Sequence, residues 1–247
     1  MADWNDTGRR QTGFSSVPRA GDAVARRETF DAGLRSHMLS IYNYMASGVL
    51  LTGIVAMLTY QSGLAVNFAS GPLMWIVALS PLAFVMAMSF GLNKMSRGTL
   101  QILFWAFATV MGLSLSTIFL RFTGESIAAT FFATAGAFAG LSLFGYTTKK
   151  DLSGMGTFLV MGVIGLIIAM VINMFLGSST LGLAISFLGV LIFAGLTAYD
   201  TQRLKREYEY LRGTEFIGKA VIMGALSLYL DFINMFMFLL QFMGNRE

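Results

Sequence analysis

The sequence predicts an all-α integral membrane protein with seven transmembrane helices, and three observations support this fold class. Only 12% of the 247 residues are charged, whereas about a quarter are charged in ordinary globular chains. Hydrophobic residues make up 55% of the chain, and they lie in long continuous blocks. Each block approaches the roughly 20 residues that an α-helix needs to cross the hydrocarbon core of a bilayer.

Seven such blocks follow a polar N-terminal segment. We expect membrane spans at residues 39–60, 72–92, 100–121, 126–146, 154–176, 181–201 and 220–243. None of them alternates with period two, as the strands of a membrane barrel would, and a helix satisfies its backbone hydrogen bonds within the segment. We therefore divide the chain into a disordered cytoplasmic tail, residues 1–35, and a seven-helix transmembrane domain, residues 36–247.

The distribution of Lys and Arg predicts how the helices are oriented. All of the 17 Lys and Arg residues except Arg121 and Arg246 lie in the N-terminal tail or in alternate loops. Positively charged loops stay in the cytoplasm, so we expect a cytoplasmic N-terminus, an external C-terminus and a plasma-membrane location. Topology and attraction to membrane lipid explain the net charge of +4, and we reject nucleic acid as a partner.

Two acidic residues interrupt the apolar blocks. Of the 13 acidic residues, only Asp200 and Asp231 lie inside them. A charged side chain at the bilayer centre costs roughly 2.5–3.5 kcal/mol on insertion scales, so intramembrane acids usually mark an ion path or a proton relay. The alternative is a hydrogen-bonded carboxyl that only joins helices. We expect no buried Lys or Arg to neutralise either acid.

If Asp200 and Asp231 meet in the bundle, they form a proton-sensitive pair, because like charges about 3 Å apart hold a shared proton. The protonated pair is a hydrogen bond between the sixth and seventh spans. The deprotonated pair repels and offers carboxylate oxygens, the ligands that Ca²⁺ prefers. Tyr199, Tyr229 and Asn234 could supply further oxygens or hydrogen bonds, although packing is the commoner role of such tyrosines.

The two acids differ in their distance from the charged loop between their spans. Asp200 lies three residues before Arg203, whereas Asp231 lies twelve residues after Lys219, which is about 18 Å at helical rise. A meeting of the two carboxyls therefore requires one of the helices to continue into the stretch between Gln202 and Lys219.

Three motifs resemble the signatures of the Bax inhibitor family, and the bacterial branch is the most similar. They are FGYTTKKDLSGMG at 144–156, GLTAYDTQRLK at 195–205 and LSLYLDFINMF at 226–236. The resemblance implies a seven-helix fold with a central seventh span, in the inner membrane for a bacterial member. It also implies a pH-sensitive Ca²⁺ leak gated by an aspartate pair, which Asp200 and Asp231 match.

The family offers two further expectations. Some bacterial relatives regulate a membrane-bound protease, which makes such a protease a candidate partner. In one bacterial branch an arginine of the second span latches the aspartate pair, whereas here the corresponding region, MSFGLNKMSRG, carries only Lys94 and Arg97.

We therefore expect a non-enzymatic, proton-gated leak for calcium or other cations, with Asp200 and Asp231 as its gate and transient metal ligands. One alternative is an adaptor or regulator that engages a membrane-bound protease through residues 1–35. A less favoured alternative is an intramembrane aspartyl protease, because Asp231 lies in LYLDFIN rather than in the GxGD motif of such enzymes. The absence of Cys and the single His argue against a zinc site, and no cofactor is expected.

Overall fold

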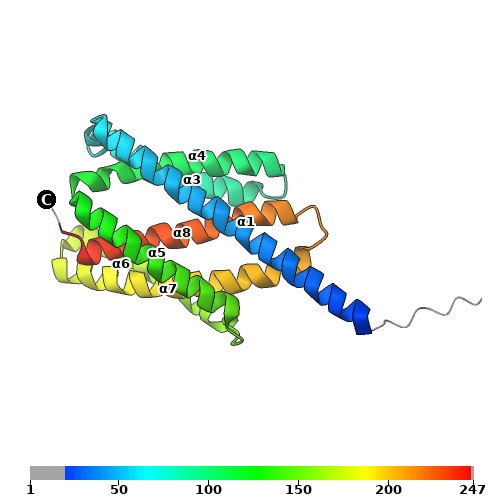
Figure 1. Ribbon diagram of the computed structural model, residues 1–247. Helices are drawn as coiled ribbons and strands as arrows, with labels where there is room; N and C mark the ends of the chain where they lie inside the picture. Colours follow the sequence, from blue (N-terminus) through cyan, green and yellow to red (C-terminus); the bar gives the residue numbers. More distant parts are fainter. Residues whose placement is uncertain (1–19, 246–247) are drawn as a thin grey trace, which may run out of the picture. The chain divides into compact units, whose positions relative to one another are not determined.

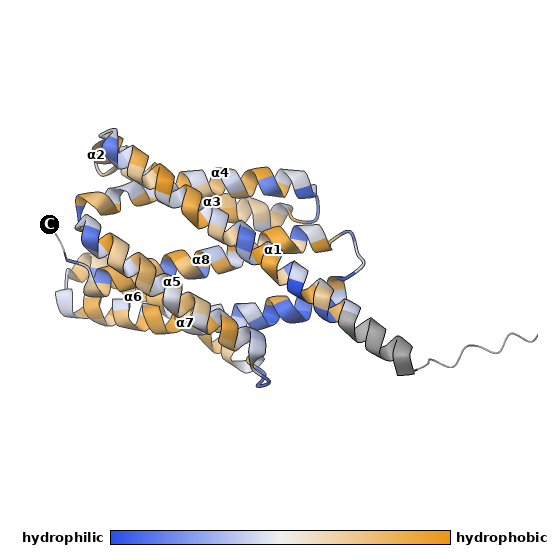
Figure 2. Cartoon of the chain, viewed as in Figure 1, coloured by the Kyte–Doolittle hydropathy of each residue, from blue (hydrophilic) through white to orange (hydrophobic). Residues whose placement is uncertain are grey.

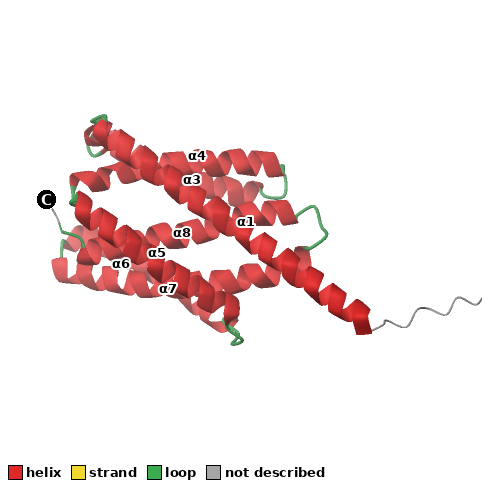
Figure 3. Ribbon diagram, in the orientation of Figure 1, coloured by secondary structure: helices red, strands yellow, loops and turns green. Residues whose placement is uncertain are grey.

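The computed structural model describes the backbone of residues 20–245 and the side chains of residues 29–245. Throughout this range the regular structure is helical, and short loops join the helices (Figure 3). Seven helices in this part of the chain are long and apolar enough to cross a membrane. The predicted all-α, seven-span fold class is confirmed.

The helices follow the predicted blocks closely, with two additions. The order is α1 (Ala20–Gln61), α2 (Leu64–Phe68), α3 (Gly71–Gly91), α4 (Arg97–Leu115), the 3₁₀ turn η1 (Ser116–Leu120), α5 (Gly124–Thr147), α6 (Ser153–Leu176), α7 (Ser179–Leu211) and α8 (Ile217–Met243). The short α2 and η1 were not expected. Helix α2 lies in the connection between α1 and α3, whereas η1 continues α4 to the end of the third span.

The first long helix begins earlier than we expected. Residues 20–35, which we assigned to a disordered tail, are helical in α1, whereas residues 1–19 of that tail lie outside the described residues. Ala and Arg, which favour helix, are frequent in this segment, and no proline lies between Pro18 and Pro72. The chain divides into two units after Ser36, and the unit that begins at His37 holds both intramembrane acids.

Helix α7 also exceeds its predicted span, and this difference removes the mismatch in depth between the two acids. It continues to Leu211, and α8 begins at Ile217. At helical rise, Asp200 lies about 17 Å before the end of α7, and Asp231 lies about 21 Å after the start of α8. Because the two helices are joined by a short loop, the acids lie at similar depths.

Helix α8 forms the centre of this unit. In its most apolar window, 72% of the residues are buried, compared with 11–33% in the other six spans. It packs against α4, α5 and α7, and in Figure 1 it runs between the α3–α4 pair and the group formed by α5, α6 and α7. The predicted central position of the seventh span is therefore confirmed.

Hydrophobic residues cover most of the long helices, and hydrophilic residues gather at helix ends and loops, most densely along the last turns of α7 (Figure 2). Two of the Lys- and Arg-rich loops contact their neighbours at the end of the unit where α7 ends and α8 begins. Lys219 donates from Nζ to the carbonyl oxygen of Leu92 over 3.1 Å, and the α5–α6 loop contacts the last turns of α7. At the opposite end, the backbone N–H of Asn245 donates to Ser126.

Candidate functional site

The site is built on the face of α7 that lies against α8. Asp200, Arg203 and Glu207 are spaced by three and four residues, so they follow one side of the helix. Arg203 forms a two-point ion pair with Asp200, with Nη1 3.1 Å from Oδ1 and Nη2 3.3 Å from Oδ2. Such fork-shaped pairing fixes both side chains in one geometry.

Ser227 connects this ion pair to α8. Its hydroxyl donates to Oδ2 of Asp200 and accepts a hydrogen bond from Nη2 of Arg203 at 3.0 Å. The carboxylate, the guanidinium and the hydroxyl therefore form a closed triangle of polar contacts between two neighbouring spans. This triangle ties α7 to α8 at the depth of Asp200.

Arg203 corrects one sequence-based expectation. We expected no buried Lys or Arg to neutralise either acid, and the sixth span was predicted to end at residue 201. Since α7 continues as a helix past residue 201, Arg203 lies one turn from Asp200 and its guanidinium reaches that carboxylate. The Arg203 side chain is 37% exposed. Its Nε lies 3.4 Å from Oε1 of Glu207, but it is not aligned for a hydrogen bond to that oxygen.

Asp231 lies one helical turn beyond Ser227 on α8, so the two side chains share a face. It is buried, with 5% of its surface exposed. Its Oδ2 has no hydrogen-bond partner among the described residues. The charged groups that act on it are Asp200 and Arg203. The structure thus brings the two acids into one site, although no direct hydrogen bond joins their carboxyl groups.

The three predicted supporting residues lie in different surroundings. The ring of Tyr199 faces Arg203, with 5.9 Å between Cζ and the ring centroid, and it packs against Gly156 of α6. Asn234 donates to the carbonyl oxygen of Leu230 in its own helix, at 2.8 Å. Tyr199 therefore borders the site through Arg203, whereas the hydrogen bond of Asn234 does not involve the acids.

Tyr229 is fully buried, and it points toward α1 and α4 rather than toward the acids. Its hydroxyl lies 2.7 Å from that of Thr52, which donates to the carbonyl oxygen of Ala108 at 2.8 Å. Because Thr52 has one hydroxyl proton, Tyr229 is the donor in their mutual bond. Its ring packs edge to face on Phe107. Tyr229 thus joins three helices through polar and aromatic contacts.

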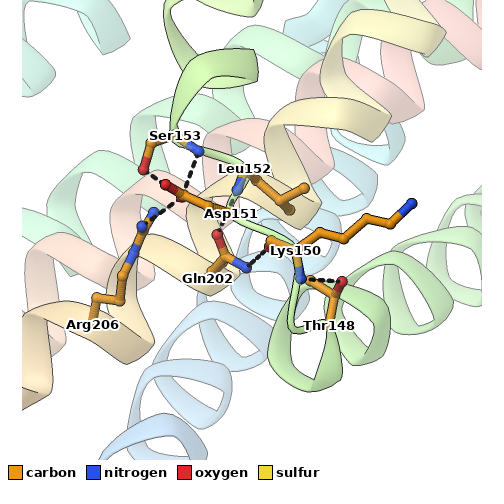
Figure 4. Close-up of polar contacts among 7 residues, drawn as sticks. All are labelled: Thr148, Lys150, Asp151, Leu152, Ser153, Gln202 and Arg206. Atoms are coloured by element: carbon orange, nitrogen blue, oxygen red, sulfur yellow. Dashed lines mark hydrogen bonds and ion pairs between the residues drawn. The ribbon is translucent and has the colours of Figure 1, made fainter.

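Another side of α7 holds the α5–α6 loop through Gln202 and Arg206 (Figure 4). The amide of Gln202 donates from Nε2 to the carbonyl oxygen of Lys150 at 2.7 Å and accepts from the N–H of Leu152 at 2.9 Å. One turn further along α7, Nη1 of Arg206 lies 2.8 Å from Oδ1 of Asp151. This clamp was not predicted from the sequence, although the spacing of Gln202 and Arg206 already places them on one helix face.

Asp151 is exposed and firmly held in its charged form. Hydrogen bonds from the Ser153 hydroxyl at 2.7 Å and the Ser153 N–H at 2.9 Å, together with the Arg206 guanidinium, lower the pKa of Asp151 to about 2. A carboxylate is stabilised by donors that favour its ionised form. The clamp therefore keeps its charge throughout the neutral and mildly acidic range.

Lys94 and Arg97 do not take the place of Arg203. Lys94 is exposed in the α3–α4 turn, and the side chain of Arg97 lies against Gly218 at the start of α8. Within the described residues, no three His, Asp or Glu side chains come together as a metal site. The predicted calcium ligands, Asp200 and Asp231, would have the Ser227 hydroxyl as a further oxygen nearby.

Comparison with known proteins agrees with the family that the three motifs indicated. Residues 34–247 match the family described as "Inhibitor of apoptosis-promoting Bax1". The protein RP147 of Rickettsia prowazekii is 45% identical over 231 residues, which cover 91% of this chain and 95% of the relative. A protein of Caulobacter vibrioides is 48% identical, covering 88% and 92%.

The inner membrane protein YbhL of Escherichia coli is 42% identical over 234 residues, which cover 93% of this chain and 98% of the relative. These matches extend over the whole seven-span domain rather than over a single motif. The chain is therefore a membrane protein of the Bax inhibitor-1 family.

Proposed function

We propose that this protein is a pH-sensitive leak for cations, calcium above all, and that Asp231 is the proton-dependent element of its gate. One observation carries the proposal: the buried carboxyl of Asp231 has an unpartnered oxygen beside an ion pair that joins α7 to α8. A buried carboxylate without a partner is costly. The charge of Asp231 is therefore coupled to the contact between these two helices.

In the closed state, Asp231 carries a proton and the Arg203–Asp200–Ser227 triangle is intact. The single negative charge of Asp200 is then balanced by the guanidinium. The two helices remain in contact, and no excess negative charge is present to attract a cation. The contacts of Arg203 with Asp200 and Ser227 support this arrangement.

Opening begins when Asp231 loses its proton. The two carboxylates then repel each other, because like charges interact strongly where little water screens them. The new charge also competes with Asp200 for Arg203, whose Nε already lies 3.4 Å from Glu207. The triangle weakens as a result, and two carboxylates become available as hard oxygen ligands for Ca²⁺. Flux should therefore rise as the pH rises.

We also propose that the N-terminus lies in the cytoplasm and that the membrane is the bacterial inner membrane. The Lys- and Arg-rich loops support this orientation, because Arg121 is the one described cation at the opposite end of the transmembrane unit. The inner membrane location of the Escherichia coli relative is consistent with it. A protease partner for the N-terminal segment remains a separate proposal, which deletion of residues 1–19 would test.

The surroundings of Asp200 favour a leak over an aspartyl protease. Such an enzyme needs two carboxyl groups that exchange protons with a water molecule between them. Asp200 is instead held by Arg203 and Ser227, which leaves it poorly placed as a general acid or base. Incubation of the purified protein with membrane-embedded peptides should yield no cleavage products.

The deciding experiment measures Ca²⁺ entry into liposomes that contain the purified full-length protein, across pH 5 to 8. Asp200→Asn and Asp231→Asn each remove one acid of the site. Asp151→Asn is the matched control, because it removes an acid outside the spans. We expect pH-dependent flux in the wild type and in the control, and loss of that dependence in Asp231→Asn. Absence of protein-dependent flux at every pH would refute the leak.

A further inference from the structure

An apolar crevice lies between α1, α4 with η1, α5 and α8, near the end of the unit where α8 ends. Its volume is about 270 Å³. Apart from Thr52, the lining consists of glycine and apolar residues, among them Phe119, Phe132 and Phe232. It is a site distinct from the polar cluster of Asp200 and Arg203.

The side chains that line the crevice have no free hydrogen-bonding group for a water molecule. The Thr52 hydroxyl is its one polar side-chain group, and it already donates to Ala108 and accepts from Tyr229. A buried water needs two to four polar partners, and a dry apolar cavity of about 150 Å³ takes up a molecule as large as benzene. A cavity of this composition and size therefore suits an apolar ligand.

The residues around the opening of the crevice indicate which class of apolar ligand can enter it. Phe132 lies at its edge with 73% of its surface exposed, and Gly53 faces it with open space where a Cβ would stand. Both residues belong to membrane-spanning helices, so the phase outside is lipid hydrocarbon. One turn of an α-helix with its side chains fills roughly 400 Å³, so a protein helix does not fit, whereas a slim acyl chain does.

A cation lies between two lining residues of the crevice in the sequence. Arg121 is exposed and lies in sequence between the lining residues Phe119 and Gly124. It has no ion pair with any described acid, including the nearby Glu125 in the first turn of α5. An unpaired guanidinium at a membrane surface is suited to a phosphate, which it can hold through two parallel hydrogen bonds.

We propose that this crevice binds one acyl chain of an anionic phospholipid from the surrounding leaflet, with the phosphate of that lipid at Arg121. The apolar lining selects the chain, and the guanidinium selects the charge of the headgroup. The lipid would then lie against Phe232, which adjoins Asp231 along α8, and would stabilise the packing of α1 and α5 on the central helix.

The chain offers a substitution that fills the crevice and a matched control. Gly53→Leu places an apolar side chain into open space within the crevice. Gly165→Leu makes the same change on α6, at an exposed glycine that also has open space around it. Ala128→Leu, at a second lining position, serves if Gly53→Leu does not fold. Arg121→Gln and Arg121→Lys separate the charge of the headgroup site from the crevice itself.

The full-length protein is equilibrated in nanodiscs that contain equal amounts of phosphatidylglycerol and phosphatidylcholine. It is then released from the nanodiscs, and the mass of the protein with its retained lipid is measured by native mass spectrometry. We expect one retained phosphatidylglycerol per chain in the wild type and in Gly165→Leu, and at least a fivefold lower occupancy in Gly53→Leu. Arg121→Gln should retain lipid without preference for phosphatidylglycerol, and Arg121→Lys should keep the preference.

Equal lipid retention in Gly53→Leu and Gly165→Leu would overturn the proposal, and so would equal loss in both. Conversion of a wild-type dimer to a monomer by Gly53→Leu, with unchanged lipid, would also overturn it, because the crevice would then be an interface between two copies of the chain. An unchanged preference for phosphatidylglycerol in Arg121→Gln would contradict the assignment of the headgroup phosphate to Arg121.

Discussion

Arg203 holds both carboxylate oxygens of Asp200, at 3.1 and 3.3 Å, from a position three residues further along the same helix. The acid that interrupts the sixth span is therefore paired within its own helix. The same guanidinium donates to Ser227 of α8, so one side chain both neutralises an intramembrane charge and joins two spans. Asp231 lies beside this arrangement with an unpartnered oxygen.

Replacing Arg203 should open the leak. Arg203→Gln removes the charge that balances Asp200 and the bond to Ser227. Because the side chain is 37% exposed, solvent screens the pair, and we expect a loss of about 1 kcal/mol, or roughly fivefold higher Ca²⁺ flux at pH 6. Arg203→Lys keeps the charge but loses the two-point contact, so its Ca²⁺ flux should lie between that of the wild type and that of Arg203→Gln. Flux equal to wild type in Arg203→Gln would contradict a latch at this position.

Gly145 should not tolerate a side chain. A Cβ at this position of α5 would collide with the backbone of Ala198 in α7, and backbone cannot move aside as a flexible side chain can. We expect Gly145→Ala to destabilise the protein by about 1–3 kcal/mol, measured as a lower midpoint of thermal unfolding in detergent.

Gly136→Ala, on the same helix, is the matched control. A Cβ there meets open space, and alanine is the better helix former, so the midpoint should stay the same or rise. Similar losses in both variants would mean that the close approach of α5 and α7 is not what constrains Gly145.

The clamp on the α5–α6 loop should depend on Gln202 more than on Arg206. Gln202 is buried and serves two backbone groups of the loop, so Gln202→Ala leaves an N–H and a carbonyl unsatisfied, at about 1–3 kcal/mol. Arg206→Gln removes an exposed ion pair that solvent screens, so its contribution is small. Hydrogen exchange of residues 148–153 should accelerate strongly in the first variant and weakly in the second. Stronger acceleration in Arg206→Gln than in Gln202→Ala would mean that the Arg206–Asp151 ion pair, rather than Gln202, holds the loop.

The pH dependence of the leak should not arise at Asp151. Its pKa is lowered to about 2 from the ordinary 3.8. A carboxyl with a depressed folded-state pKa stabilises the fold above its unfolded pKa, and that contribution is lost only as the pH falls through the folded value. Between pH 5 and 8 the charge of Asp151 is constant. Asp151→Asn should leave the midpoint of the flux profile where it is, and a shifted midpoint would contradict this assignment.

The seven spans could be predicted from the sequence because long apolar blocks have few other stable conformations in a bilayer. The end of the sixth span could not be placed, because charged side chains at a membrane boundary can extend toward the aqueous phase while their backbone stays helical. That one boundary decided whether Arg203 was interpreted as a loop residue or as the partner of Asp200.

Other contacts of the site depend on tertiary packing. Ser227, which bridges the two helices, is an ordinary serine in its motif, and only the approach of α7 to α8 gives it a role. Tyr229 is two residues from Asp231, yet its side chain points to Thr52 of α1, because residues two apart on a helix face different directions. Proximity along the sequence was therefore a poor guide to which tyrosine borders the acids.

The central claim is that the proton of Asp231 controls the contact between α7 and α8, and a distance measurement tests it most directly. The chain has no cysteine, so Tyr210→Cys at the exposed end of α7 and Asn93→Cys in the α3–α4 turn, which is bonded to α8 through Lys219, can carry a pair of spin labels. Pulsed electron resonance in liposomes would follow their separation from pH 5 to 8. We predict that the separation grows with pH in the wild type and stays constant in Asp231→Asn. A change of the same size in Asp231→Asn, or no change in the wild type, would contradict the account.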